Sequence, residues 1–215
     1  YLHSANKSSV NGILLQSQNA ESTKISGSVS HIGGMFGDVY NLNLNKVYGT
    51  DKYSKAVVKV DINAPGAKYV GGFAGFANDV HYAGGFGINS NRTDQNVIER
   101  VIAAEYVGGI AGFGRNVTGS TADGYSIVYD SVTGSSNVGA LFGGLESANY
   151  VELAHSVICN TVTGSSTTGG LVGYLLTKGG YTPKVKSTIK TINGSVDVGA
   201  YFGILDISIA DQPVN

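Results

Sequence analysis

The sequence predicts an all-β fold, a parallel β-solenoid of about six coils with about 30 residues each. The first observation behind this prediction is a glycine signature: an apolar residue or threonine, two small residues, two apolar residues and a glycine. Its six copies span residues 32–37, 70–75, 107–112, 138–143, 168–173 and 198–203. Their first glycines lie 38, 37, 31, 30 and 30 residues apart. A repeat of this size indicates supersecondary units stacked on one another.

The second observation concerns the segments before the signatures. They favour β-structure, as in 156–162 and 188–192, and glycine-containing polar turns join most of them to the signature. Each unit is therefore predicted to be a strand, a glycine turn, one short glycine-rich strand and a returning loop. Third, no segment has a convincing helical period. Residues 96–105 come nearest to one, but their place in the repeat predicts a strand. We expect one domain, 1–215, with coils around 25–60, 61–100, 101–130, 131–160, 161–190 and 191–210.

The third glycine of each signature is predicted to be structural. Parallel stacking places equivalent residues of successive coils about 4.8 Å apart, so Val70, Val107 and Val138 would form one column. The third glycines would form a ladder without side chains, which suits a sharp corner, a positive φ angle or close approach of neighbouring backbone. These glycines are Gly37, Gly75, Gly112, Gly143, Gly173 and Gly203. An antiparallel β-sandwich is the alternative fold.

Composition excludes several classes of protein. The 32 glycines among 215 residues have no three-residue period, and 42% hydrophobic residues argue against a disordered linker. A net charge of −1 without a lysine or arginine cluster predicts no nucleic-acid partner. No apolar run approaches the roughly 18 residues that a membrane span needs. The single cysteine, Cys159, is predicted to be a buried small residue. Because the sequence begins at Tyr1, we expect a processed or excised segment.

The signature resembles the GLUG repeat, a glycine-rich motif of large bacterial surface and secreted proteins, including some IgA-cleaving zinc peptidases. The six copies cover most of the chain, although Ala140 and Ala200 replace the second glycine in two of them. The resemblance implies a secreted or cell-surface location and a stalk or adhesive role. It implies no chemistry of the repeats themselves.

The sequence predicts no enzyme activity and no cofactor. No two of its histidines have the spacing of a zinc-peptidase helix, and the acidic residues do not recur with the repeat. The histidines are His3, His31, His81 and His155. One polar run offers alternate oxygen ligands that resemble a calcium loop, but it lacks the glycine and the final glutamate of that motif. Its ligands would be Asn89, Asn91, Thr93 and Asp94.

The two longer repeats direct attention to an inserted loop, 77–96, because insertions in solenoids often form the binding face. The predicted ligand-binding residues in it are Asp79, His81, Tyr82, Asn91 and Arg92. Tyrosines near turns, such as Tyr69 and Tyr106, suit stacking on sugar rings or protein surfaces, or they cap the edges of the core.

We therefore expect a structural or adhesive module that displays loops to a glycan, a host protein or another copy of itself. A carbohydrate-active β-helix enzyme and the non-catalytic region of a large surface peptidase are the alternatives. Self-association through open coil ends is also expected, since the sequence suggests no cap at either end.

Overall fold

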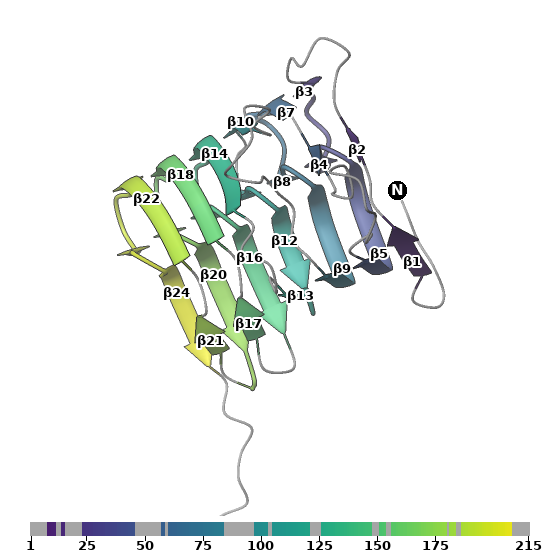
Figure 1. Cartoon of the computed structure of the whole chain (residues 1–215). Coiled ribbons are helices and arrows are strands. Elements are labelled where there is room, and N and C mark those ends of the chain that lie inside the picture. Colours follow the sequence, from purple (N-terminus) through teal and green to yellow (C-terminus); the bar gives the residue numbers. More distant parts are fainter. Residues whose placement is uncertain are drawn as a thin grey trace, which may run out of the picture.

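The computed structural model describes residues 8–11, 14–15, 23–45, 57–58, 60–83, 97–102, 105–120, 126–147, 151–153, 156–179, 181–183 and 186–207 (Figure 1). All regular structure in these residues is β-strand, and every strand pair is parallel. The predicted all-β class is confirmed, and the antiparallel sandwich is wrong. In this described part of the chain there is no helix that could cross a membrane.

Two sheets have six strands each. The upstream sheet, named for its place before the glycine signatures, contains β3 (Thr23–Ser26), β7 (Val60–Asn63), β10 (Val97–Ile102), β14 (Ser126–Thr133), β18 (Ser156–Thr163) and β22 (Lys186–Asn193). The corner sheet contains β4 (His31–Gly33), β8 (Tyr69–Gly71), β11 (Tyr106–Gly108), β15 (Val138–Gly139), β19 (Thr168–Gly169) and β23 (Val198–Gly199). Strand β10 confirms the strand expected within 96–105.

The third large sheet has eight strands. They are β1 (Ser8–Asn11), β5 (Phe36–Asn45), β9 (Ala74–Ala83), β12 (Ala111–Arg115), β16 (Phe142–Ser147), β20 (Val172–Thr177) and β24 (Phe202–Ile207), with β13 (Thr118–Ser120) paired to β9. Two small sheets pair β17 (Val151–Leu153) with β21 (Tyr181–Pro183) and β2 (Leu14–Leu15) with β6 (Val57–Val58).

The three large sheets take their strands in chain order, so the described chain falls into six units (Figure 1). Each unit contributes to the upstream sheet, then the corner sheet, then the eight-stranded sheet. The units are β3–β5, β7–β9, β10–β13, β14–β16, β18–β20 and β22–β24, numbered 1 to 6. Signature residues pair in register, since Val107 lies opposite both Val70 and Val138, as the column prediction requires.

The glycine signature differs from its prediction in one respect. Instead of one short strand it spans two strands in two sheets, for example β8 and β9 with a bend at residues 72–73. A β-carbon on Gly71 would collide with the carbonyl oxygen of Ala74, and one on Gly75 would lie 2.9 Å from that of Tyr69. The two glycines therefore let the backbone before and after the bend meet at a sharp corner.

The third glycines are required by close approach of backbone, since none of the six has a φ angle in the left-handed region. A β-carbon on Gly112 or Gly143 would collide with a backbone nitrogen of the preceding unit, that of Val70 or Val107. The same crowding by the preceding unit holds at Gly75, Gly173 and Gly203. At Gly37, in unit 1, the nearest described atom is the carbonyl oxygen of His31, 3.3 Å away.

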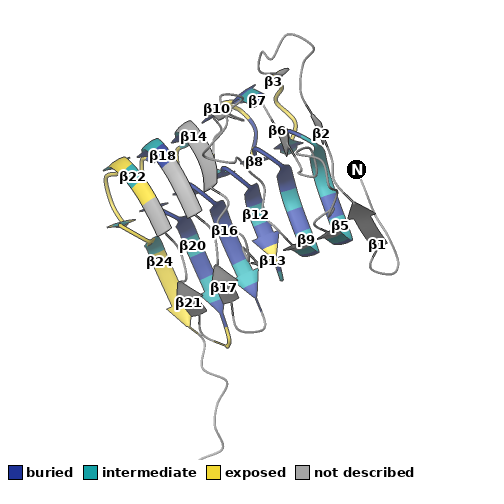
Figure 2. Cartoon of the chain, viewed as in Figure 1, coloured by how far each residue is buried: buried dark blue, intermediate teal, exposed yellow. Residues whose placement is uncertain are grey.

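The core lies between the sheets and is built of stacked apolar columns. In the upstream sheet Val101, Val132 and Val162 are fully buried and pair in register. Cys159 is also fully buried, which confirms its predicted environment. Unit 6 differs from the others because its side chains are largely exposed (Figure 2). Leu205 is 37% exposed there, whereas Leu175, its register partner in unit 5, is completely buried.

Candidate functional site

The candidate site lies on the outer face of the eight-stranded sheet. Side chains alternate along its strands, so that Ala77 is buried while its neighbours Phe76 and Asn78 are partly exposed. Because the strands are parallel and in register, outward side chains of successive units form rows across the sheet. The outer face therefore repeats a few side-chain positions along the stack of units.

One of these rows is aromatic. Phe76 and Phe113 are register partners whose ring centroids are 5.9 Å apart, with ring planes within 3° of parallel. The ring of Tyr40, from unit 1, lies 5.7 Å from that of Phe76 but belongs to the neighbouring row, because Tyr40 pairs with Asn78 whereas Asp38 pairs with Phe76. All three rings are partly exposed, which indicates that they line the surface rather than fill the core.

The corner sheet supplies further rings to the same surface. Tyr69 and Tyr106 stack with centroids 5.0 Å apart, and both meet Phe113 edge-on at 6.0 and 5.4 Å. His31 lies 4.9 Å from Tyr69. We call this set, six partly exposed rings from units 1 to 3, the aromatic cluster. Its members are His31, Tyr40, Tyr69, Phe76, Tyr106 and Phe113.

A glycine in unit 4 marks the end of the aromatic cluster. Gly144 is the register partner of Phe113, and a β-carbon on it would lie 2.7 Å from the Phe113 ring and 3.0 Å from that of Tyr106. The missing side chain leaves room for both rings. Burial raises the pKa of Tyr106, and the neighbouring Tyr69 raises it further. Like any tyrosine at neutral pH, Tyr106 is protonated, so its hydroxyl can donate a hydrogen bond.

The charged groups around the rings are paired. The Nζ of Lys68 lies 3.3 Å from the carboxylate of Glu105 and 5.4 Å from the centroid of the Tyr69 ring. The hydrogen bond to Glu105 raises the pKa of Lys68. The Nδ1 of His31 lies 2.5 Å from a carboxylate oxygen of Asp38. The rings are thus bordered by the ion pair of Lys68 with Glu105 and by the contact of His31 with Asp38, rather than by a field of one sign.

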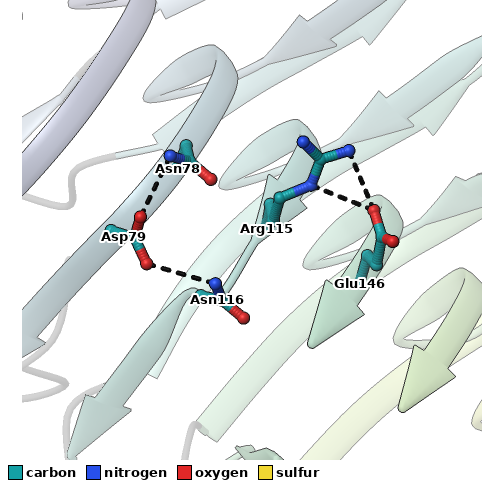
Figure 3. A network of polar contacts seen from close by, with 5 residues as sticks. All are labelled: Asn78, Asp79, Arg115, Asn116 and Glu146. Atoms are coloured by element: carbon teal, nitrogen blue, oxygen red, sulfur yellow. Dashed lines mark hydrogen bonds and ion pairs between the residues drawn. The ribbon is translucent and has the colours of Figure 1, made fainter. Parts of the chain in front are cut away.

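A polar network lies beside the aromatic cluster, starting two residues further along the strands. Figure 3 shows its five side chains. Arg115 contacts Glu146 through two nitrogens, each 3.0 Å from the same carboxylate oxygen. The side-chain amides of Asn78 and Asn116 donate to the two oxygens of Asp79 at 3.1 and 3.2 Å. These five residues, from units 2 to 4, constitute the polar network.

A row of residues with left-handed backbone runs through the polar network and continues into unit 1. Asp79 and Asn116 have φ angles of 53° and 49°, and Asn41, which register places beside Asp79, has 53°. Aspartate and asparagine tolerate this conformation better than other residues with a side chain. The conformation bends the strands, so that burial continues at Val80 and Val117 after the bend. The described residues of units 4 to 6 have no such bend in this sheet, and their strands here are six residues long.

Two of the five predicted ligand-binding residues contact the next unit. Asp79 lies in the polar network, and Nδ1 of His81 is 2.9 Å from the hydroxyl of Thr118. The expected loop is wrong for residues 77–83, which belong to strand β9, because the bend at Asp79 lets the strand continue. The side chain of Tyr82, and Asn91 and Arg92 entirely, lie outside the described residues. So does the calcium-like run of Asn89, Asn91, Thr93 and Asp94.

Sequence reasoning considered Tyr69 and Tyr106 singly but missed the cluster. The signal was present, because in the second and third copies an aromatic residue stands on each side of the signature. The pairs are Tyr69 with Phe76 and Tyr106 with Phe113. Since the signature forms a corner, the two flanking side chains both point outward and meet.

The described residues contain no group of three or more histidine, cysteine, aspartate or glutamate side chains that could hold a metal ion. What the outer face offers is apolar ring surface beside amide, guanidinium and carboxylate groups, which is the chemistry of binding. Comparisons with protein-family models, curated proteins and solved structures found no match to this chain.

Proposed function

We propose that this chain is a parallel β-solenoid serving as a structural or adhesive module of a secreted or cell-surface protein. The proposed solenoid is supported by the recurrence of the same three strands in six units and by their continuous register. The resemblance of the signature to the GLUG repeat supports the location and the adhesive role. The module acts by display, presenting one face of a stiff stack to its partner.

The observation that carries this proposal is the aromatic cluster. Buried valine columns already hold the units together, yet six rings remain partly exposed on one face. Contiguous exposed apolar surface with a polar border is typical of interaction sites. Beside these rings the polar network adds donors and acceptors, among them Arg115 with a half-exposed side chain.

The solenoid is tested by a distance between its ends. Lys24 and Thr191 occupy equivalent positions in units 1 and 6, five register steps apart. Spin labels on cysteines at these two positions should be separated by about 24 Å, five steps of roughly 4.8 Å. Buried Cys159 should not react with the label. A separation that does not grow with the number of units between the labels would exclude the solenoid.

The adhesive role is tested by arrays of glycans and extracellular proteins probed with the folded chain. We expect binding that is lost when Phe76 and Phe113 are both replaced by serine. Tyr201→Ser is the matched control, because Tyr201 is an exposed ring outside the aromatic cluster. Retention of binding by the double variant would exclude the outer face as the displayed surface, and binding to nothing would exclude an adhesive role.

Self-association through the end of the stack is a second candidate role, and the exposed core positions of unit 6 favour it. Val198 is 47% exposed, although its register partner Thr168 is completely buried. Leu205 is likewise exposed, whereas its register partner Leu175 is buried. Strands β22, β23 and β24 are the last in their sheets. We expect the mass in sedimentation equilibrium to rise with concentration and Leu205→Lys to abolish the rise. A mass that stays at one chain throughout would exclude this role.

A further inference from the structure

We propose that copies of this chain join head to tail, so that unit 6 of one copy stacks on unit 1 of the next in the orientation that successive units have within one chain. This inference rests on self-association through the end of the stack, the second role proposed above, and identifies the surface that meets unit 6. That surface is the opposite end of another copy and not a second unit 6.

Unit 6 presents backbone donors that point along the stack. At the corner of unit 5, three amides donate to carbonyl oxygens of unit 6 over 2.8 to 2.9 Å, and the same three positions of unit 4 donate to unit 5. The donors of unit 5 are Thr168, Gly170 and Leu171. Register makes Val198, Ala200 and Tyr201 their counterparts in unit 6, and the described residues contain no further unit to accept from these amides. The stack therefore ends in three donors that are open to an acceptor.

Unit 1 presents the matching acceptors. The hydrogen bonds from unit 5 end on carbonyl oxygens of unit 6 that include those of Gly199 and Tyr201. Register makes Gly33 and Met35 the counterparts of these two residues in unit 1. Among the described residues, no amide of an earlier unit reaches their carbonyl oxygens. Stacking in the same orientation pairs donors with acceptors, whereas two copies of unit 6 facing each other would bury donors against donors.

Strand β1 leaves room for this junction. Through the register of the eight-stranded sheet, β24 (Phe202–Ile207) corresponds to residues 36–41 of β5. Strand β1 pairs only with residues 42–45 of β5, so it begins where a docked β24 would end. Strands β3 and β4 are the outermost described strands of their own sheets. Each of the three terminal strands of unit 6 thus has an edge in unit 1 to pair with.

An exposed valine lies at both ends of the stack. Val196 and Val29 are 68% and 63% exposed, the highest values among the large apolar residues that the structure describes. Each lies in the turn before the corner strand of its unit, and units 4 and 5 have a serine at the position of Val196. In the head-to-tail junction Val29 lies one residue from register with Val196. The two side chains can therefore cover each other, which the serines inside the stack do not need to do.

The apolar gain lies on the side of unit 6. Val198 and Leu205 are 47% and 37% exposed, while Ile32 and Val39, their counterparts in unit 1, are buried. Burial of the unit 6 side chains therefore drives the junction, and unit 1 contributes acceptors and register. Because the contact joins unlike ends, each assembly keeps one free unit 1 and one free unit 6. Such a contact does not close, so the mass should pass two chains and keep rising with concentration.

The direction is tested by mixing two variants that are each blocked at one end. Val29→Lys blocks unit 1 and Val196→Lys blocks unit 6, and both positions are exposed, so neither substitution should unfold the chain. Alone, each variant should associate about tenfold or more weakly than the unaltered chain, because the junction would bury a charge. In an equimolar mixture, the intact unit 6 of one variant meets the intact unit 1 of the other. Sedimentation equilibrium should then show pairs that grow no further.

The matched control is Ser165→Lys, which places the same charge in the equivalent exposed turn of unit 5 and should associate as the unaltered chain does. Cross-linking gives a second readout. A Val29→Cys chain mixed with a Val196→Cys chain under oxidising conditions should form a mixed disulfide, while buried Cys159 stays reduced. Dimers of the Val29→Lys variant alone, or disulfides mainly between two Val196→Cys chains, would overturn the head-to-tail direction and leave self-association standing. A mass of one chain at every concentration would overturn both.

Discussion

The backbone nitrogen of Val107 occupies the space that a β-carbon on Gly143 would need. The two residues belong to successive units, and the same contact recurs between Val70 and Gly112 one unit earlier. The distance between units at the corner is therefore set by glycine, because any side chain at this position would push one backbone away from the next.

The first prediction concerns this contact. Gly143→Ala should lower the free energy of unfolding by about 3 kcal/mol, the upper range for overpacking a tight interior, because the obstacle is backbone that cannot rotate away. Gly37→Ala should cost far less, since its nearest described neighbour is 3.3 Å away. Urea unfolding followed by circular dichroism gives both values. Equal losses for the two variants would mean that the preceding unit does not impose the glycine.

A second prediction concerns Thr168, whose side chain is completely buried in a column of valines. Its hydroxyl has no hydrogen-bond partner among the described residues, and its register partners are Val138 and Val198. Thr168→Val keeps the shape and removes an unpaired polar group, so it should stabilise the fold by about 1 to 2 kcal/mol.

The matched control is Thr177, which is equally buried but accepts a hydrogen bond from the backbone nitrogen of Gly179 at 3.3 Å. Thr177→Val should destabilise the fold by about 1 kcal/mol. Melting temperatures that move in opposite directions for the two substitutions would support the assignment. A loss of stability on Thr168→Val would contradict it.

A third prediction separates the two roles of Asp79, which has a left-handed backbone and accepts hydrogen bonds from Asn78 and Asn116. Asp79→Asn keeps the backbone preference and one acceptor oxygen. Asp79→Gly keeps the backbone freedom alone, and Asp79→Ala keeps neither. We expect stability to fall in that order, with alanine about 1 to 2 kcal/mol below the wild type. If Asp79→Ala and Asp79→Gly have the same free energy of unfolding in urea, the left-handed backbone of Asp79 does not contribute to stability.

A fourth prediction concerns the ion pair of Arg115 and Glu146, whose side chains are 51% and 37% exposed. A double-mutant cycle with Arg115→Ala and Glu146→Ala should give a coupling energy of about 0.5 kcal/mol, because water screens exposed pairs. The coupling should decrease further in concentrated salt. A coupling of several kcal/mol would instead assign the pair a structural role and weaken the case for Arg115 as part of the displayed surface.

The repeat and its register could be predicted because parallel pairing places equivalent residues side by side, so a period in the chain becomes a column in the fold. Val70 and Val107 illustrate this. A sharp corner is one of three roles that suit the glycine ladder, but the sequence could not place it inside the signature, since the residues from Gly71 to Gly75 are as compatible with one strand as with two. The structure decides for two strands, β8 and β9, with Gly71 crowded against the carbonyl oxygen of Ala74 across the bend.

The candidate site was harder to predict for a related reason. The extra length of the second repeat predicts a loop over 77–96, whereas Ala77 and Val80 are both buried, a spacing of three that departs from simple strand alternation. The left-handed Asp79 between them restores the strand. The aromatic cluster depends on contacts between units, so its rings could be recognised one by one in the sequence but not as a surface.

The last units are evenly spaced along the chain, so a whole unit can be deleted or duplicated without disturbing the others. Strands β14, β18 and β22 begin at Ser126, Ser156 and Lys186, thirty residues apart, and each has eight residues. Deleting or duplicating residues 156–185 would therefore join matching ends and return every column to register. The aromatic cluster lies wholly in units 1 to 3, so the length of the stack can be altered by unequal recombination while the cluster is inherited unchanged.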